Sequence, residues 1–156
     1  MIESGNRVPD THLVDREGKR HALHDLLDRP TLVIVFKPSC PTCQMGLPVY
    51  DHWRRYEPSA RILAVSQDTV AATDALYGEF HLGFETFYDK PPYAMSNAFG
   101  VFAVPSLFLI EDGQVTWTGY GWAKADAEHI EERLATLVDK TPALVNADHL
   151  PSLKPG

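Results

Sequence analysis

Short apolar runs and longer amphipathic segments alternate along most of the chain. The run Leu32–Phe36 is wholly apolar and rich in β-branched residues, which is typical of a central strand buried on both faces. Similar strand patterns occupy Arg61–Ser66, Glu85–Tyr88, Pro105–Ile110 and Val115–Tyr120. An Asp-Gly turn separates the last two, so the sequence predicts that they pair as a hairpin.

Helical patterns fill the intervals between these strands. Helices are predicted from Cys40 to about Tyr56 with Pro48 inside, over Val70–Phe80, over Pro92–Phe99 and over Ala127–Val138. Before the first buried strand, a hairpin is predicted from two short strands, Thr11–Val14 and Lys19–Ala22, and it is followed by a helical turn at Leu23–Leu27.

This order of elements places the chain in the α/β class. Strand–helix alternation, followed by a hairpin and a final helix, predicts one mixed central sheet with helices on both faces. Residues 1–140 carry the whole pattern and fit one domain of ordinary size. Residues 141–156 contain three prolines and little periodicity, so we expect a C-terminal tail that is an arm or a poorly ordered end.

Composition narrows the classes of function. The formal net charge is −7 and lysines and arginines do not cluster, which argues against a nucleic-acid partner. No apolar run approaches the roughly 20 residues that span a bilayer, so membrane insertion is not expected. The first residues lack a signal-peptide pattern, which favours a cytoplasmic location, or an extracytoplasmic one for a trimmed mature form. Without a glycine-rich phosphate loop, no nucleotide cofactor is predicted.

The two cysteines, Cys40 and Cys43, give the strongest functional signal. Closing so short a loop removes little entropy from the unfolded chain, so a purely stabilising disulfide would achieve little. The pair supplies only two of the four ligands that a zinc ion needs, so no metal site is predicted. As a dithiol that forms and breaks an internal disulfide, the pair is complete.

The position of Cys40 at the start of a helix explains how it would react. Pro41 suits the first helical position, because its φ is preset and its missing N–H would have had no partner. The N–H groups of Thr42 and Cys43 then point toward the Cys40 sulfur and, with the helix dipole, stabilise a thiolate. Cys43, one turn further along, is placed to resolve a mixed disulfide formed at Cys40.

With an apolar strand, the Cys-Pro-Thr-Cys motif at 40–43 and a helix in succession, the chain resembles the thioredoxin-like superfamily. The segment Gly100–Ile110 resembles the second hallmark of that superfamily, a strand opened by a cis-proline, here Pro105. The N-terminal hairpin and the extra strand and helix inserted before Pro105 are most similar to its redoxin or TlpA-like branch. The resemblance therefore implies a thioredoxin-like fold with a βα insertion.

The same resemblance implies a function. It indicates a thiol–disulfide oxidoreductase that exchanges with protein or small-molecule disulfides and dithiols, with Cys40 and Cys43 as the catalytic residues. It implies that the strand opened by the cis-proline faces Cys40 and offers main-chain hydrogen bonds to an extended substrate. The residues that would contact the substrate are Pro41, Thr42, Val104 and Pro105.

The chain departs from these relatives at positions that matter for proton transfer. Ile34 stands where thioredoxins carry a buried aspartate, and Gly46 stands where the TlpA-like branch often has a glutamate. The sequence therefore assigns no proton acceptor to Cys43. The pair Pro41-Thr42 replaces the Gly-Pro of thioredoxin, so the resemblance does not predict whether the chain reduces or oxidises its partners.

Two alternatives stay open on the same fold. Cys40-Pro41-Thr42 also resembles the active-site sequence of peroxiredoxins, which act as thiol peroxidases. Against that reading, Lys37 stands where those enzymes carry Thr or Ser, and Arg133 lies far along the chain in the last predicted helix. The other alternative is a non-enzymatic module that binds a metal or a partner.

The remaining polar clusters are predicted to be surface features. His12, His21 and His24 lie in and after the first hairpin, where exposed histidines are common. The charged residues of Glu128–Glu132 are predicted to form a solvated face of the last helix.

Overall fold

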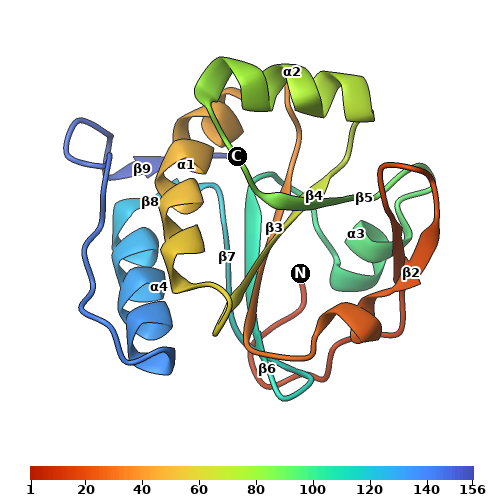
Figure 1. Ribbon diagram of the computed structural model, residues 1–156, viewed down its shortest axis with the longest axis horizontal. Coiled ribbons are helices and arrows are strands. Elements are labelled where there is room, and N and C mark those ends of the chain that lie inside the picture. Colours follow the sequence, from red (N-terminus) through yellow and green to blue (C-terminus); the bar gives the residue numbers. More distant parts are fainter.

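A seven-stranded mixed sheet forms the centre of the computed structural model, which describes residues 1–156 (Figure 1). Its strands are β1 (His12–Val14), β2 (Arg20–Ala22), β3 (Thr31–Phe36), β4 (Arg61–Ser66), β5 (Glu85–Tyr88), β6 (Ser106–Glu111) and β7 (Gln114–Tyr120). Across the sheet they lie in the order β2-β1-β5-β4-β3-β6-β7. The central strand β3 runs parallel to β4 and antiparallel to β6, which confirms the predicted mixed sheet.

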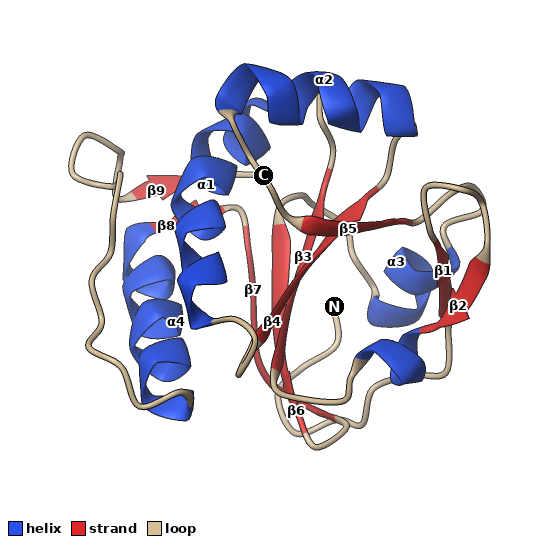
Figure 2. Cartoon of the chain, viewed as in Figure 1, coloured by secondary structure: helices blue, strands red, loops and turns tan.

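Helices cover both faces of this sheet, as the sequence predicts (Figure 2). They are the 3₁₀ turn η1 (Leu23–Leu26), α1 (Pro41–Asp51), the 3₁₀ segment η2 (His52–Tyr56), α2 (Val70–Phe80), α3 (Ala94–Phe99) and α4 (Lys124–Leu137). The predicted helix ending at Tyr56 tightens into η2 over its last residues. The final helix begins earlier than predicted, at Lys124, where lysine and alanine are good helix formers. None of these helices combines the length and the apolar character that a membrane span needs.

The central strand β3 holds two hydrophobic cores together. All six of its residues are buried, and successive side chains point to opposite faces of the sheet. Leu32, Ile34 and Phe36 pack with α1, α2 and α4, whereas Val33 and Val35 pack with η1, α3 and the N-terminal segment. Burying one such side chain contributes about 1.5–3 kcal/mol to the stability of the fold. The end of β3, from which the loop to Cys40 begins, is therefore fixed in place.

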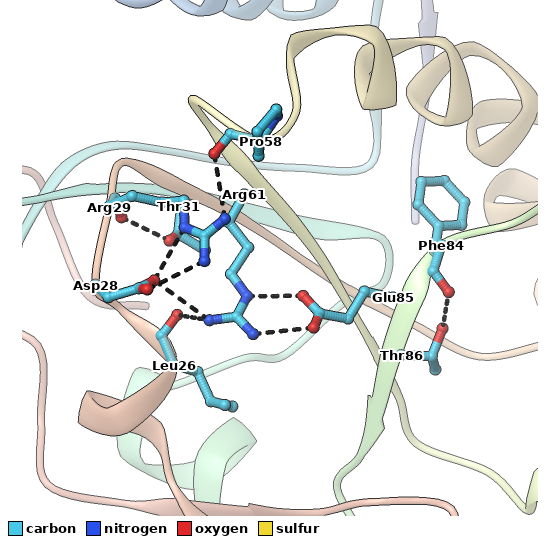
Figure 3. Close-up of polar contacts among 9 residues, drawn as sticks. All are labelled: Leu26, Asp28, Arg29, Thr31, Pro58, Arg61, Phe84, Glu85 and Thr86. Carbon is cyan, nitrogen blue, oxygen red and sulfur yellow. Dashed lines mark hydrogen bonds and ion pairs between the residues drawn. The ribbon is translucent and has the colours of Figure 1, made fainter.

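An ion cluster around Arg61 lies at the other end of the sheet, where β3 and β4 begin (Figure 3). The Arg61 guanidinium makes a bidentate pair with Glu85, at 2.7 and 2.9 Å, and donates to the Leu26 carbonyl at 2.7 Å. Bidentate pairs of this kind are among the stronger hydrogen-bonded contacts in proteins. They tie β4 to β5 and to η1, so the cluster is structural and remote from the cysteines.

The C-terminal residues 141–156, called the arm from here on, are folded against the domain. The arm ends in β9 (Leu153–Lys154), which pairs antiparallel with the short strand β8 (Trp122–Ala123). Ala147 is buried, and Leu144 and Leu150 pack on the core that contains α1 and α4. Of the two expectations for this tail, the structure therefore shows an arm and not a poorly ordered end.

The predicted solvated face at Glu128–Glu132 is wrong at one position, because Glu131 is only 2% exposed. Its carboxylate accepts hydrogen bonds from Arg55, from the Tyr56 hydroxyl and from the main-chain N–H of Ala143. A buried charge is tolerated when it is paired in this way. Since Ala143 belongs to the arm, Glu131 anchors the beginning of the arm to α4.

Candidate active site

Cys40 lies where the chain leaves the loop after β3 and enters α1, as predicted. Its φ of −80° and ψ of 118° are extended, and it is the N-cap of α1, with Pro41 at the first helical position. The Cys40 sulfur accepts a hydrogen bond from the main-chain N–H of Cys43 at 3.2 Å. Cys40 is partly exposed and stands at the positive end of the helix dipole, where an anionic sulfur is favoured.

Cys43 has a different environment one turn further along the helix. It is fully buried, and both cysteines are free thiols in the structure. Burial, and after it the hydrogen bond to Cys40, raises the pKa of the Cys43 thiol far above its ordinary value. Cys43 therefore stays protonated at neutral pH unless another group takes its proton.

The loop before β6 brings the second predicted segment to Cys40. The peptide bond between Val104 and Pro105 is cis, and Pro105 is buried. The Cys40 thiol donates a hydrogen bond to the Val104 carbonyl at 3.5 Å. The structure thus places Val104 directly against the Cys40 sulfur, whereas Pro41 is exposed at the surface.

The arm covers Thr42, another residue predicted to bind the substrate. The Thr42 hydroxyl donates a hydrogen bond to the Pro155 carbonyl at 2.6 Å. The chain at Gly156 lies so close to Val104 that a Cβ at position 156 would stand 2.3 Å from the Val104 carbonyl oxygen. Figure 1 shows this end of the arm beside the first turn of α1. Part of the predicted substrate surface is therefore occupied by the chain itself.

A small cavity between α1, β7 and the start of α4 is lined by three ionisable residues that sequence reasoning did not assign to the site, Tyr50, Tyr120 and Asp126. Its volume is about 10 Å³, close to the space that one water molecule needs. Gly46 makes room for the tyrosine, since a Cβ at position 46 would lie 2.9 Å from the Tyr50 hydroxyl oxygen. Burial and the charges of Cys43 and Asp126 raise the pKa of Tyr50, and burial raises the pKa of Asp126.

No spacing in the sequence could have connected these groups. Asp126 lies more than eighty positions after Cys43 in the chain, in a helix start that looks like any other with an early acid. The clue that was available is Gly46 itself, a glycine inside a predicted helix, which often marks a packing requirement.

A larger cavity, of about 230 Å³, is lined by residues that neighbour Cys40, although Cys40 itself is not part of the lining. Its lining combines polar side chains with the loop before β6, namely Lys37, Gln67, Tyr93, Ser96, Asn97 and residues 101–104. Two of these residues contact Cys40, because the Lys37 carbonyl accepts from the Cys40 N–H at 3.1 Å and the Val104 carbonyl accepts from its thiol. No residue of the arm lines this cavity.

The other residues that the sequence singled out lie away from the cysteines. Arg133 pairs with Glu111 at 2.6 Å, at the opposite end of β6 from Pro105. His21 pairs with Asp15 at 2.8 Å in the first hairpin. No group of three or more His, Cys, Asp or Glu side chains is placed to hold a metal ion.

Residues 4–118 match the sequence model of the AhpC/TSA family. None of the curated proteins is similar enough in sequence to count as a match. Among solved structures, the chain is similar to a putative thiol:disulfide interchange protein DsbE from Chlorobium tepidum, with a TM-score of 0.76 and 21% identity over 88% of this chain and 99% of that one.

Two further structures are similar to a comparable degree. DsbF of MTB has a TM-score of 0.68 and 22% identity, over 81% of this chain and 93% of that chain. Peroxidoxin BcpB from Mycobacterium tuberculosis has a TM-score of 0.70 and 20% identity, over 88% and 97% of the two chains. At these identities the likeness shows the fold, which is thioredoxin-like.

Proposed function

The chain belongs to the AhpC/TSA family, and on that premise we propose that it is a thiol–disulfide oxidoreductase whose Cys40 forms mixed disulfides that Cys43 resolves. The observation that carries the proposal is the 3.2 Å hydrogen bond from the Cys43 N–H to the Cys40 sulfur at the N-terminus of α1. That bond and the helix dipole favour the thiolate, which is the attacking form of a cysteine.

In the first step, the Cys40 thiolate attacks one sulfur of a substrate disulfide. A bond forms between Cys40 and that sulfur, the substrate disulfide breaks, and the other substrate sulfur leaves as a thiolate that takes a proton from water. In the second step, deprotonated Cys43 attacks the Cys40 sulfur and releases the first substrate sulfur as a thiolate. Two electrons have then passed from the dithiol to the substrate, and the reverse sequence would oxidise a substrate dithiol.

The second step needs an acceptor for the Cys43 proton, because burial keeps that thiol protonated. In this proposal the acceptor is Asp126. Its carboxyl shares a cavity with Tyr50, and Cys43 in its ionised form raises the pKa of the same tyrosine. The Tyr50 hydroxyl, with one water in the cavity, would carry the proton between them. This route uses the space that Gly46 leaves open.

The experiment that tests the proposal is a redox titration of the cysteine pair in defined thiol buffers, read by trapping and intact mass. We expect a reversible internal disulfide between Cys40 and Cys43. A potential of about −270 mV would indicate a reductant, and one of about −120 mV an oxidant. A pair that forms no internal disulfide at any potential would overturn the proposal.

Reduction of peroxides is the second candidate, because the family match and the likeness to a peroxidoxin both favour it. In that reaction the Cys40 thiolate attacks a peroxide oxygen, an alcohol or water leaves, and a sulfenic acid forms on Cys40. Cys43 would condense with the sulfenic acid and release water. Lys37 is exposed and Arg133 is held by Glu111, so neither offers the peroxide a fixed partner. Peroxide consumption that depends on Cys40 without added disulfides would favour this candidate.

A further inference from the structure

The last four residues of the arm, 153–156, are called the tip below. We infer that the tip is a size filter on the substrates of Cys40, which admits low-molecular-weight disulfides while it is docked and excludes disulfides of folded polypeptides. The inference rests on the proposed function, since it names the substrate class of the same site. It follows from the contacts that the tip makes next to Cys40 and from a nearby cavity that the tip does not line.

On the covered side, the tip contacts both segments that flank the reactive sulfur. Its Pro155 carbonyl accepts the hydrogen bond from Thr42, two residues after Cys40. Its Gly156 lies against Val104, whose carbonyl accepts from the Cys40 thiol. These contacts bridge the start of α1 and the loop before β6, so a second chain cannot lie there at the same time.

A polypeptide substrate needs that space more than a small one does. An extended chain binds beside another strand through its main-chain groups, over several residues on each side of the reacting group. The main chain around Val104 is the edge available for such pairing next to Cys40, and Gly156 already lies on it. A disulfide held between two polypeptide segments would therefore collide with the tip before its sulfur reached Cys40.

We place the approach of a small disulfide in the cavity of about 230 Å³, because two of its lining residues, Lys37 and Val104, accept hydrogen bonds from Cys40. This volume is below the roughly 300–1,000 Å³ of pockets that hold drug-sized ligands. Its polar lining, which includes Lys37 and Gln67, suits a small, hydrophilic thiol compound. No arm residue lines it, so docking of the tip leaves this approach unchanged.

The arm is held firmly at its base and weakly at its tip. The base is fixed by Glu131, by the buried Ala147 and by the Trp122 indole, which donates to the Pro151 carbonyl at 2.6 Å. The tip is held by the two-residue pairing of β8 with β9, by the bond from Thr42 and by main-chain packing on Gly121 and Val104, and its Leu153 is 70% exposed. Segments with few buried contacts open locally at small cost, so the tip can leave while the base stays.

The test compares exchange with cystine and with insulin in three full-length or shortened forms. A chain ending at Ser152 keeps the bonds of Pro151 to Trp122 and of Ser152 to Lys124, and loses only the tip. Gly156→Val keeps the full length, but its side chain would collide with the main chain of Val104. Leu153→Ala is the matched control, because that exposed side chain is not part of the docking contacts.

We expect both altered forms to raise kcat/KM for insulin by about tenfold, which corresponds to about 1.4 kcal/mol, and to leave kcat/KM for cystine unchanged within about twofold. Leu153→Ala should match the original chain for both substrates. Equal rates with insulin before and after removal of the tip would overturn the inference. So would a rise of the same size for cystine, because a filter acts on one substrate class only.

A second readout does not depend on exchange. Cys40 is labelled with iodoacetamide and, separately, with a polyethylene-glycol maleimide, and the two rates are measured by mass. The tip should slow only the bulky reagent, and its removal should restore that rate. If labelling follows this expectation but neither substrate reacts, the proposed function fails and the steric filter stands. If both reagents react equally before and after removal, the filter fails whatever the activity.

Discussion

Cys40 and Cys43 lie on one turn of α1, yet they differ in the properties that govern thiol chemistry. Cys40 is partly exposed and accepts an N–H at the helix start, whereas Cys43 is fully buried and has a raised pKa. Their side chains lie on the same side of the helix and contact each other, so the difference arises from position along it: Cys40 caps the exposed end of α1, whereas Cys43 lies one turn further in and is buried in the core. The comparison teaches that burial and hydrogen bonding can give two chemically identical groups the different properties that the proposed attacking and resolving roles need.

Replacing Cys40 by serine removes the exposed member of the pair and is expected to have the largest effect. Disulfide exchange with cystine should fall to the uncatalysed rate, because a serine hydroxyl is not ionised at neutral pH. Serine is itself a favoured N-cap residue, so the thermal unfolding midpoint should change little. Exchange that survives in this variant would show that Cys40 is not the attacking thiol.

Replacing Cys43 by serine removes the buried member and should leave the first step intact. The variant is expected to react once with a disulfide and then to hold it as a mixed disulfide on Cys40, because no second thiol releases it. Intact mass before and after addition of dithiothreitol measures this adduct. Continued turnover without an adduct would mean that an outside thiol, and not Cys43, resolves the intermediate.

The environment of Cys43 can be altered without touching either thiol. Asp126→Asn should slow release from the mixed disulfide by about tenfold, a modest loss for general-base catalysis, and should leave the first step unchanged. Single-turnover kinetics separate the two steps. Glu128→Gln is the matched control, since Glu128 is an exposed acid on the same helix. Equal release rates in both variants would remove Asp126 from the mechanism.

The smallest expected effect is on stability. Burial raises the pKa of Asp126 in the folded state, so the folded protein binds more protons than the unfolded chain between the ordinary and the raised pKa. The contribution of Asp126 to the free energy of unfolding is therefore greatest below the ordinary pKa and declines as the pH rises through the raised one.

Asp126→Asn removes that decline, so the variant should be modestly more stable than the original chain near neutral pH. Urea midpoints measured near neutral pH and near the ordinary aspartate pKa check the sign. A variant that is less stable at neutral pH would mean that the ionised carboxylate makes a stabilising contact.

Much of the fold could be predicted from sequence because its elements carry strong local signals. The apolar run of β3 and the Asp-Gly turn between β6 and β7 have the expected positions. The strand order across the sheet follows from connection rules and long-range pairing, which no single segment encodes. The start of α4 and the tightening of η2 depend on packing, and boundaries set by packing are the least visible in sequence.

The candidate site also has some features that local sequence predicts and others that depend on contacts between distant segments. Cys40 and its helix N-terminus are local features, so the motif was sufficient to place them. The roles proposed for Tyr50 and Asp126 depend on a cavity that both residues line, although they belong to distant segments of the chain. Glu131 looked like a surface acid because its partners, including Arg55 and Ala143, come from other parts of the chain.

The arm reaches the active site mainly through main-chain atoms. The Pro155 carbonyl meets Thr42, the Gly156 backbone lies on Val104, and β9 pairs with β8. Main-chain atoms are the same in almost every residue, so the residue types at 153–155 can change without loss of these contacts. Insertion of one residue after Pro151 would not be tolerated in the same way. A shift of one position turns every following main-chain group to the opposite side of the strand, so the contacts with Thr42 and Val104 would be lost. Across an evolving set of such chains, the constant feature would be spacing and not residue type.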